Sequence, residues 1–165
     1  MHRPRMSIVL VVVFTLALSL GVERAHAYVA FLSGGEQVPP VQTAAQAMVV
    51  MQLSADGTYL SYRVSVTNIA DVSGVLLHLG GPGTIGPGVV SLFAGGQSPV
   101  EGFGPVNPQR ISGVIAQGLI TPSNLSGPLA GQPLSALVNA IQAGAAYVSV
   151  YTKSHPYGEV RGQVR

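Results

Sequence analysis

The sequence of 165 residues contains no cysteine and no tryptophan, and only 8% of its residues are charged. The absence of cysteine excludes a disulfide framework, a thiol nucleophile, an iron–sulfur or cysteine-ligated zinc site, and the acylated cysteine of a bacterial lipoprotein. The few lysine and arginine residues form no basic cluster, which argues against nucleic-acid binding. A single domain of this size buries roughly two-thirds of its unfolded surface. It can therefore build a stable core without disulfide bonds or metal sites.

The N-terminus has the pattern of a cleavable secretory signal peptide. A histidine and two arginines precede an almost unbroken apolar run over residues 8–20, and the sequence AHA at residues 25–27 has the small-x-small form of a cleavage site. The run is short for a membrane span of about 20 residues, so we favour cleavage over a retained anchor. We predict a signal peptide at residues 1–27, a secreted or periplasmic protein, and no membrane span after cleavage.

The basic character of the sequence, with a pI near 9.2, belongs to this leader. Arg3, Arg5 and Arg24 lie in it against Glu23 alone. Residues 28–165 therefore hold five basic and five acidic residues, with a formal charge of zero. We interpret the pI as a feature of export and expect no nucleic-acid partner.

Short segments of alternating apolar and polar residues recur along the chain, with turn sequences between them. Residues 45–53 and 59–66 both alternate with period two, and Asp56-Gly57 between them favours a hairpin turn. Further strands are predicted at residues 28–32, 74–79, 89–93, 111–120, 146–152 and 159–164. This pattern predicts an all-β domain, an antiparallel β-sandwich or barrel that is immunoglobulin-like or superoxide-dismutase-like.

One segment and two loops interrupt the strands. Residues 133–143 have apolar residues at helical spacing, begin with a proline and are followed by Gly144, so they predict one short helix packed over an end or seam of the sheets. Residues 80–88 are rich in glycine and proline, and they predict a rigid connection. This segment lacks the Lys-Ser/Thr ending of a phosphate-binding loop. Residues 94–109 predict a second long loop.

Three stretches of the sequence resemble the chordin-type domain, usually called CHRD. They are LSGGEQVPPVQTA at residues 32–44, HLGGPGTIGP at residues 78–87 and GAAYVSVYTKSHPYGEVRGQ at residues 144–163. The third stretch is the most specific, and the resemblance covers residues 28–165. It implies a secreted β-sandwich domain, common in exported bacterial proteins and present in an extracellular growth-factor antagonist. It implies no established catalytic activity.

The sequence departs from the family pattern where polar groups would meet. Leu76 and Tyr151 stand where the family usually has histidine, Ser149 and Ile85 where it has asparagine, and Gln37 where it has glutamate. If the family's paired histidines form a metal or polar site, this chain is expected to have lost most of it.

Metal binding has little support in the sequence. A zinc or copper site needs about three ligands, preferably imidazole or thiolate, and residues 28–165 offer only His78 and His155. A family-type H-x-H motif would be similar to that of copper–zinc superoxide dismutases, but Leu76 interrupts it. We therefore predict no metal and no cofactor, with His78 structural or vestigial.

Glu159 and Arg161 are two residues apart and so share one face of a predicted strand. In a domain with so few charges, they predict an internal polar clamp between strands. The functional alternative is that Arg161 contacts a ligand.

No carboxylate pair and no G-x-S-x-G nucleophile pattern is present, so we predict no enzyme. The expected function is an exported binding or structural module, with His78, Tyr151, Glu159 and Arg161 as the candidate binding residues. The low charge favours a neutral protein or glycan ligand. Two alternatives stay open: a degenerate metal-binding, superoxide-dismutase-like protein, and a self-associating surface or matrix protein.

Overall fold

The computed structural model describes residues 26–94 and 110–165. Almost all of the predicted signal peptide and of the predicted loop at residues 94–109 lies outside the described residues. The described part contains eight strands and one α-helix, α1 (Leu134–Gln142). The strands are β1 (Ala27–Ser33), β2 (Gln46–Leu53), β3 (Leu60–Ile69), β4 (Val72–Leu79), β5 (Gly88–Ala94), β6 (Ile111–Ile120), β7 (Ala146–Thr152) and β8 (Val160–Gln163).

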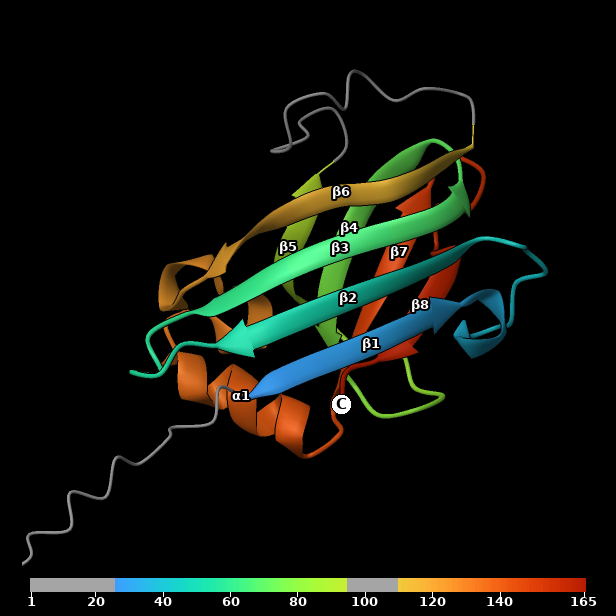
Figure 1. The fold of residues 1–165 in the computed structure, drawn as a ribbon. Coiled ribbons are helices and arrows are strands. Elements are labelled where there is room, and N and C mark those ends of the chain that lie inside the picture. The colour runs from blue at the N-terminus through green and yellow to red at the C-terminus, as the bar shows by residue number, and fades with distance from the viewer. Residues whose placement is uncertain (1–25, 95–109) are drawn as a thin grey trace, which may run out of the picture.

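The eight strands form one antiparallel sheet in the order β5-β4-β7-β8-β1-β2-β3-β6. The sheet curls into a nearly closed barrel, with β1, β2, β3 and β6 in one layer and the other four strands behind them (Figure 1). The Tyr62 hydroxyl on β3 donates to the Leu92 carbonyl oxygen on the edge strand β5 at 2.9 Å, which links β5 to the neighbour of the other edge strand, β6. The predicted antiparallel sandwich or barrel with one short helix is confirmed.

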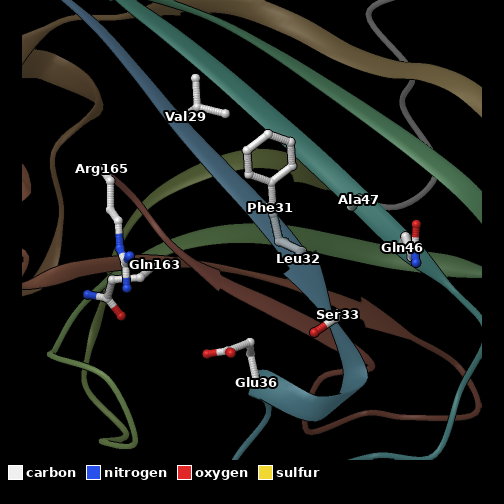
Figure 2. Close-up of a pocket in the computed structure, with 9 residues that line it drawn as sticks. All are labelled: Val29, Phe31, Leu32, Ser33, Glu36, Gln46, Ala47, Gln163 and Arg165. Atoms are coloured by element: carbon white, nitrogen blue, oxygen red, sulfur yellow. The ribbon is translucent and has the colours of Figure 1, made fainter.

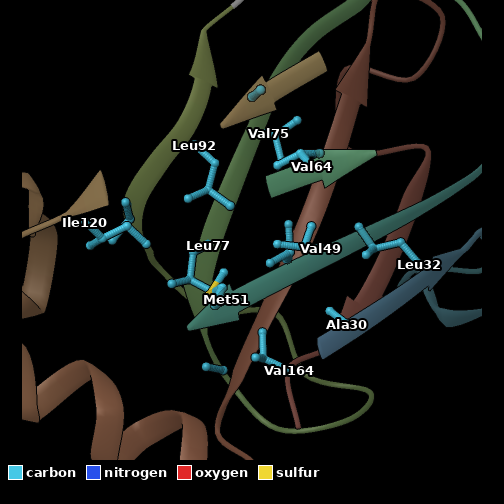
Figure 3. Packing of buried hydrophobic residues seen from close by; sticks show 14 of the residues in the cluster. Ala30, Leu32, Val49, Met51, Val64, Val75, Leu77, Leu92, Ile120 and Val164 are labelled. Atoms are coloured by element: carbon cyan, nitrogen blue, oxygen red, sulfur yellow. The ribbon is translucent and has the colours of Figure 1, made fainter. Parts of the chain in front are cut away.

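The core fills the space between the two layers. On the hairpin of β2 and β3, Val49 pairs with Val64 and Met51 with Tyr62, so the apolar residues of the period-two pattern face inward together. Figure 3 shows Val49, Met51 and Val64 packed in one cluster with Leu77 of β4 and Leu92 of β5. Truncating a fully buried side chain of this kind to alanine costs about 2–5 kcal/mol.

The predicted hairpin turn between β2 and β3 is confirmed. Gly57 has a φ of 70°, which favours glycine. The Asp56 carboxylate accepts hydrogen bonds from the Ser54 hydroxyl at 2.7 Å and from the Thr58 backbone N–H at 3.1 Å. Both bonds lower the pKa of Asp56, and the bond from Ser54 has the larger effect.

Helix α1 lies at one end of the barrel (Figure 1). Pro133 precedes its first turn, and Gly144 follows its C-terminus with a φ of 68°. Its buried residues are Leu134, Leu137, Val138 and Ile141, the apolar residues that define the helical pattern. The Gln142 amide donates to the Tyr28 hydroxyl of β1 at 3.0 Å. No helix in the described part of the chain is long and apolar enough to cross a membrane.

The predicted strand boundaries agree with the structure to within three residues. β3 continues to Ile69 instead of ending at residue 66, because its pairing with β6 resumes after an irregularity in which Asn68 has a φ of 56°. Asparagine is common in turns, so Asn68 indicates a turn in the sequence at this point.

Candidate functional site

The outer face of β4, β7 and β8 carries most of the polar residues of interest. On these neighbouring strands, core residues alternate with residues on the opposite face. The register places His78 opposite Tyr147 and Ser149 opposite Arg161. Tyr151 lies two residues beyond Ser149 and hence on the same face. Strand pairing thus gathers a histidine, two tyrosines, a serine and an arginine.

Three connections cover this face and form a pocket with it. They are residues 37–41 between β1 and β2, residues 80–87 between β4 and β5, and residues 154–158 between β7 and β8. The pocket has a volume of about 590 Å³, and we call it the Arg161 pocket. Its buried lining residues include Gln37, His78, Tyr147, Ser149 and Arg161, and its exposed rim residues include Pro39, Ile85, Pro156 and Tyr157.

Both ring nitrogens of His78 are engaged. Nδ1 lies 2.9 Å from the Gly86 carbonyl oxygen, which can only accept, so Nδ1 carries the proton. Nε2 then accepts from the Tyr151 hydroxyl at 2.8 Å. Burial lowers the pKa of His78, the nearby positive charge of Arg161 lowers it further, and the bond to Gly86 acts in the opposite direction. His78 is thus a neutral, fixed ring.

Metal-ligating side chains do not converge here. Across residues 26–94 and 110–165, no three histidine, cysteine, aspartate or glutamate side chains are grouped so that they could hold a metal ion. The nitrogen of His78 that would coordinate a metal is occupied by Tyr151.

Arg161 is only 3% exposed. Its guanidinium carbon lies 3.7 Å from the centre of the Tyr147 ring, and Nη2 donates to the Gly81 carbonyl oxygen at 2.9 Å. The His78 ring stacks on Tyr147 with centroids 4.9 Å apart and planes 7° apart. Since β7 lies between β4 and β8, the tyrosine ring is held between the imidazole and the guanidinium.

Glu159 is buried next to the pocket, with partners of its own. Its carboxylate accepts from the Thr43 hydroxyl at 2.7 Å and from the Thr152 hydroxyl at 2.8 Å. Nδ1 of His155 lies 3.4 Å from the same carboxylate. Within residues 26–94 and 110–165, this is the one approach of a basic side-chain nitrogen to a carboxylate within 4.0 Å, so Arg161 pairs with no carboxylate of this part. Glu159 and Arg161 therefore do not bond to each other as the predicted polar clamp would require, and each makes contacts of its own.

The glycine-rich connection at residues 80–87 is held by side chains of the strands beneath it. The Gln163 amide donates to the Gly80 carbonyl oxygen at 2.8 Å, and the Tyr147 hydroxyl accepts from the Gly86 N–H at 3.1 Å. A Cβ on Gly86 would overlap the Leu79 carbonyl oxygen. These contacts give the physical basis for the rigid connection expected from its prolines.

Several positions that depart from the family pattern meet in the structure and form new polar contacts. The Tyr151 hydroxyl bonds to His78, and the Gln37 amide donates to the Ser149 hydroxyl at 2.8 Å. These positions therefore make polar contacts with one another and with His78 in this chain. The groups that make these contacts are the hydroxyls of Tyr151 and Ser149 and the amide of Gln37.

A second pocket, of about 650 Å³, lies along β1 (Figure 2). Phe31 on β1, which is 74% exposed, lines it together with Glu36 from the turn after this strand and Arg165 from the end of the chain. Its two charged residues, Glu36 and Arg165, are both exposed. The Arg161 pocket, with its buried charge, is the better candidate for a built site.

Three of the four sequence-predicted candidates, His78, Tyr151 and Arg161, line the Arg161 pocket, whereas Glu159 does not. The sequence did not single out Tyr147 as a site residue, whereas Tyr157, expected from the sequence to be an exposed tyrosine available to a neutral partner, lines the pocket. Tyr147 could have been found from the alternation in β7, because it lies two residues before Ser149 and shares its face of the strand.

The described part of the chain is a small all-β barrel domain with a polar pocket on its outer face. The family model described as CHRD domain matches residues 28–164, and the chain belongs to this family. Domains of this family are extracellular or periplasmic. Neither the comparison with curated proteins nor the comparison with solved structures gives a match.

Proposed function

We propose that the protein is an exported, non-catalytic CHRD domain that binds a protein or glycan ligand through the Arg161 pocket. The observation that carries this proposal is the pocket itself. It combines buried polar side chains at its base with exposed apolar residues at its rim, as ligand sites commonly do. Its rim belongs to connections on a rigid barrel, where recognition surfaces usually lie.

The rim favours contact with an uncharged part of a ligand. Tyr157 is 95% exposed and Ile85 is 77% exposed, and both line the pocket. An exposed aromatic ring offers a large contact area at a low cost in conformational entropy.

The arrangement of polar groups supports a role without catalysis. Ser149, the serine at the base, is bonded to Gln37 and lies opposite Arg161, with no imidazole activating it. His78 uses both nitrogens in holding Gly86 and Tyr151. Acyl transfer needs at least a nucleophile and a base within reach of one another, and the bonds of Ser149 and His78 do not join them as such a pair.

Binding is tested by screening glycans and small molecules against the purified protein with ligand-observed NMR. The matched variants are Ile85→Ser with Tyr157→Ala at the rim, and Phe31→Ser on β1. We expect signals that disappear in the rim variant and persist in Phe31→Ser. Signals unchanged by the rim variant, or none with the wild type, would contradict the proposal.

Export is tested separately by mass spectrometry of the protein recovered outside the cytoplasm. The support for export is the leader pattern at residues 1–27. We expect an N-terminus at Tyr28. Recovery of the uncleaved chain from the cytoplasm alone would contradict export without affecting the binding proposal.

Self-association is a second candidate function, because Phe31 and Met48 pair across β1 and β2 and are 74% and 38% exposed. Light scattering after size-exclusion chromatography across a concentration series tests it. We expect the apparent mass to rise with concentration and Phe31→Ser to remove the rise. A constant monomer mass would contradict this candidate.

A further inference from the structure

The Arg161 pocket contains a buried positive charge without a matching negative one. Arg161 is 3% exposed, and its partners are one carbonyl oxygen and one aromatic face. Within residues 26–94 and 110–165, the carboxylates make no ion pair with it. Burying a charge costs several kcal/mol unless a partner compensates. A carbonyl and a ring compensate only in part.

The guanidinium has donors to spare. It carries five N–H groups in a planar fork, and the structure uses Nη2 for the Gly81 carbonyl oxygen. In the described part of the chain, one buried side-chain atom, Nδ1 of His155, is both shielded from solvent and without a hydrogen bond. No nitrogen of Arg161 is in this state. The remaining donors of Arg161 are therefore accessible from the pocket that this residue lines.

The groups beside Arg161 do not supply a negative charge. His78 is neutral, because burial lowers its pKa and its Nε2 accepts from the Tyr151 hydroxyl. Tyr151 stays protonated, because burial raises the pKa of its hydroxyl. Glu159, the nearest buried acid along the chain, is bonded to Thr43 and Thr152 and is not among the residues that line the pocket.

We infer that the Arg161 pocket binds a carboxylate attached to an apolar body, with Arg161 anchoring the carboxylate and the exposed rim residues Ile85 and Tyr157 contacting the body. A carboxylate is the planar acceptor that matches the guanidinium fork. The apolar rim distinguishes this ligand from inorganic anions. The inference rests on the proposed function and specifies its ligand chemistry. Such a group occurs in free monocarboxylic acids and at the C-terminus of a polypeptide.

The test compares acids with amides of the same shape. Phenylacetate and phenylacetamide represent the free compound, and N-acetyl-phenylalanine and its amide represent a polypeptide C-terminus. Affinities are measured by NMR titration of wild type, Arg161→Gln, Arg161→Lys and Arg63→Gln. Glutamine keeps a donor for Gly81 without the charge, lysine keeps the charge without the fork, and Arg63 is an exposed arginine on β3.

We expect each acid to bind the wild type at least about tenfold more tightly than its amide, as a charge-assisted bidentate contact requires. Arg161→Gln should abolish this preference, Arg161→Lys should reduce it by a few fold, and Arg63→Gln should leave it unchanged. Binding of phenylacetate as tight as that of N-acetyl-phenylalanine would identify the free acid as sufficient, and weaker binding would identify the polypeptide C-terminus.

Equal affinities for acid and amide, both lost in Tyr157→Ala, would overturn the inference and leave the proposed function standing. Acid binding that survives Arg161→Gln would overturn it as well. If no compound of either series binds and the rim screen is also empty, the proposed function fails. If Arg161→Gln does not fold, the acid and amide series on wild type and Tyr157→Ala still decide the matter.

Discussion

The two outer faces of the barrel obey the same period-two alternation and have opposite characters. On the layer of β1, β2 and β3, outward residues such as Phe31, Met48 and Arg63 are exposed. On β4, β7 and β8, the outward residues His78 and Arg161 are buried beneath connections.

The difference shows what burial demands of a polar side chain. A buried donor or acceptor without a partner costs about 1–3 kcal/mol, so each polar group on the covered face is bonded to a connection or to a neighbouring strand. Arg161 and Gln163 hold Gly81 and Gly80, and His78 holds Gly86. The exposed face has no such requirement. We expect substitutions to have large effects on the covered face and small ones on the exposed face.

The largest effect is expected for Glu159→Ala. It removes a buried acceptor and leaves the hydroxyls of Thr43 and Thr152 without their partner, which costs about 3 kcal/mol of unfolding free energy. Urea denaturation measures it. The matched control is Asp56→Ala, an acid with three bonds in an exposed turn, which should lose much less. Equal losses would contradict the contrast between the faces.

Arg161→Ala should cost about 1 kcal/mol, because the lost bond to the Gly81 carbonyl and the lost packing on Tyr147 outweigh the relief of a buried charge that is compensated only in part. Thermal unfolding measures this loss. The control is Arg63→Ala on the exposed face, for which we expect less than about 0.5 kcal/mol. Unchanged stability in Arg161→Ala would remove the structural role of this residue.

A smaller effect is expected from pH. The pKa of His78 is lowered in the folded protein, mainly by burial, so below the ordinary histidine pKa of about 6.5 the unfolded chain binds more protons. The stability that His78 contributes is present above that pH and is lost as the pH falls toward the folded-state pKa. His78→Gln should show a weaker decline in urea midpoint between neutral and mildly acidic pH. Parallel declines would contradict the buried neutral ring.

The smallest effect is expected for Phe31→Ser on the exposed face, with a change of less than about 0.5 kcal/mol in unfolding free energy. Leu32, the next residue on β1, is 2% exposed and faces the core. Leu32→Ser should cost several times more by the same urea titration. A large loss in Phe31→Ser would show that this face is packed against something in solution.

Much of the fold was predictable from the sequence, because alternation and turn residues act locally. The hairpin around Asp56-Gly57 and the helix before Gly144 follow from such signals. The pairing order of the strands did not, since β8 pairs with β1 across most of the chain.

The candidate site was only partly predictable. His78, Tyr151 and Arg161 stood out as residue types in a chain with little charge. Their meeting depends on the register of β4, β7 and β8 and on the connections that fold over these strands, and no local pattern encodes either. From the sequence alone, Tyr151 and Ser149 indicate a lost polar site, whereas the strand register shows that their hydroxyls form hydrogen bonds there.

The position of β8 has a consequence for how the barrel is assembled. β8 is the last strand along the chain, yet it lies in the middle of the sheet, where it joins β5-β4-β7 to β1-β2-β3-β6. The backbone of Arg165 also bonds in both directions to Val29, close to the start of β1. The strands of each half can pair with one another, but the barrel is completed only when β8 inserts between the two halves. Non-local pairing of this kind makes closure a slow step.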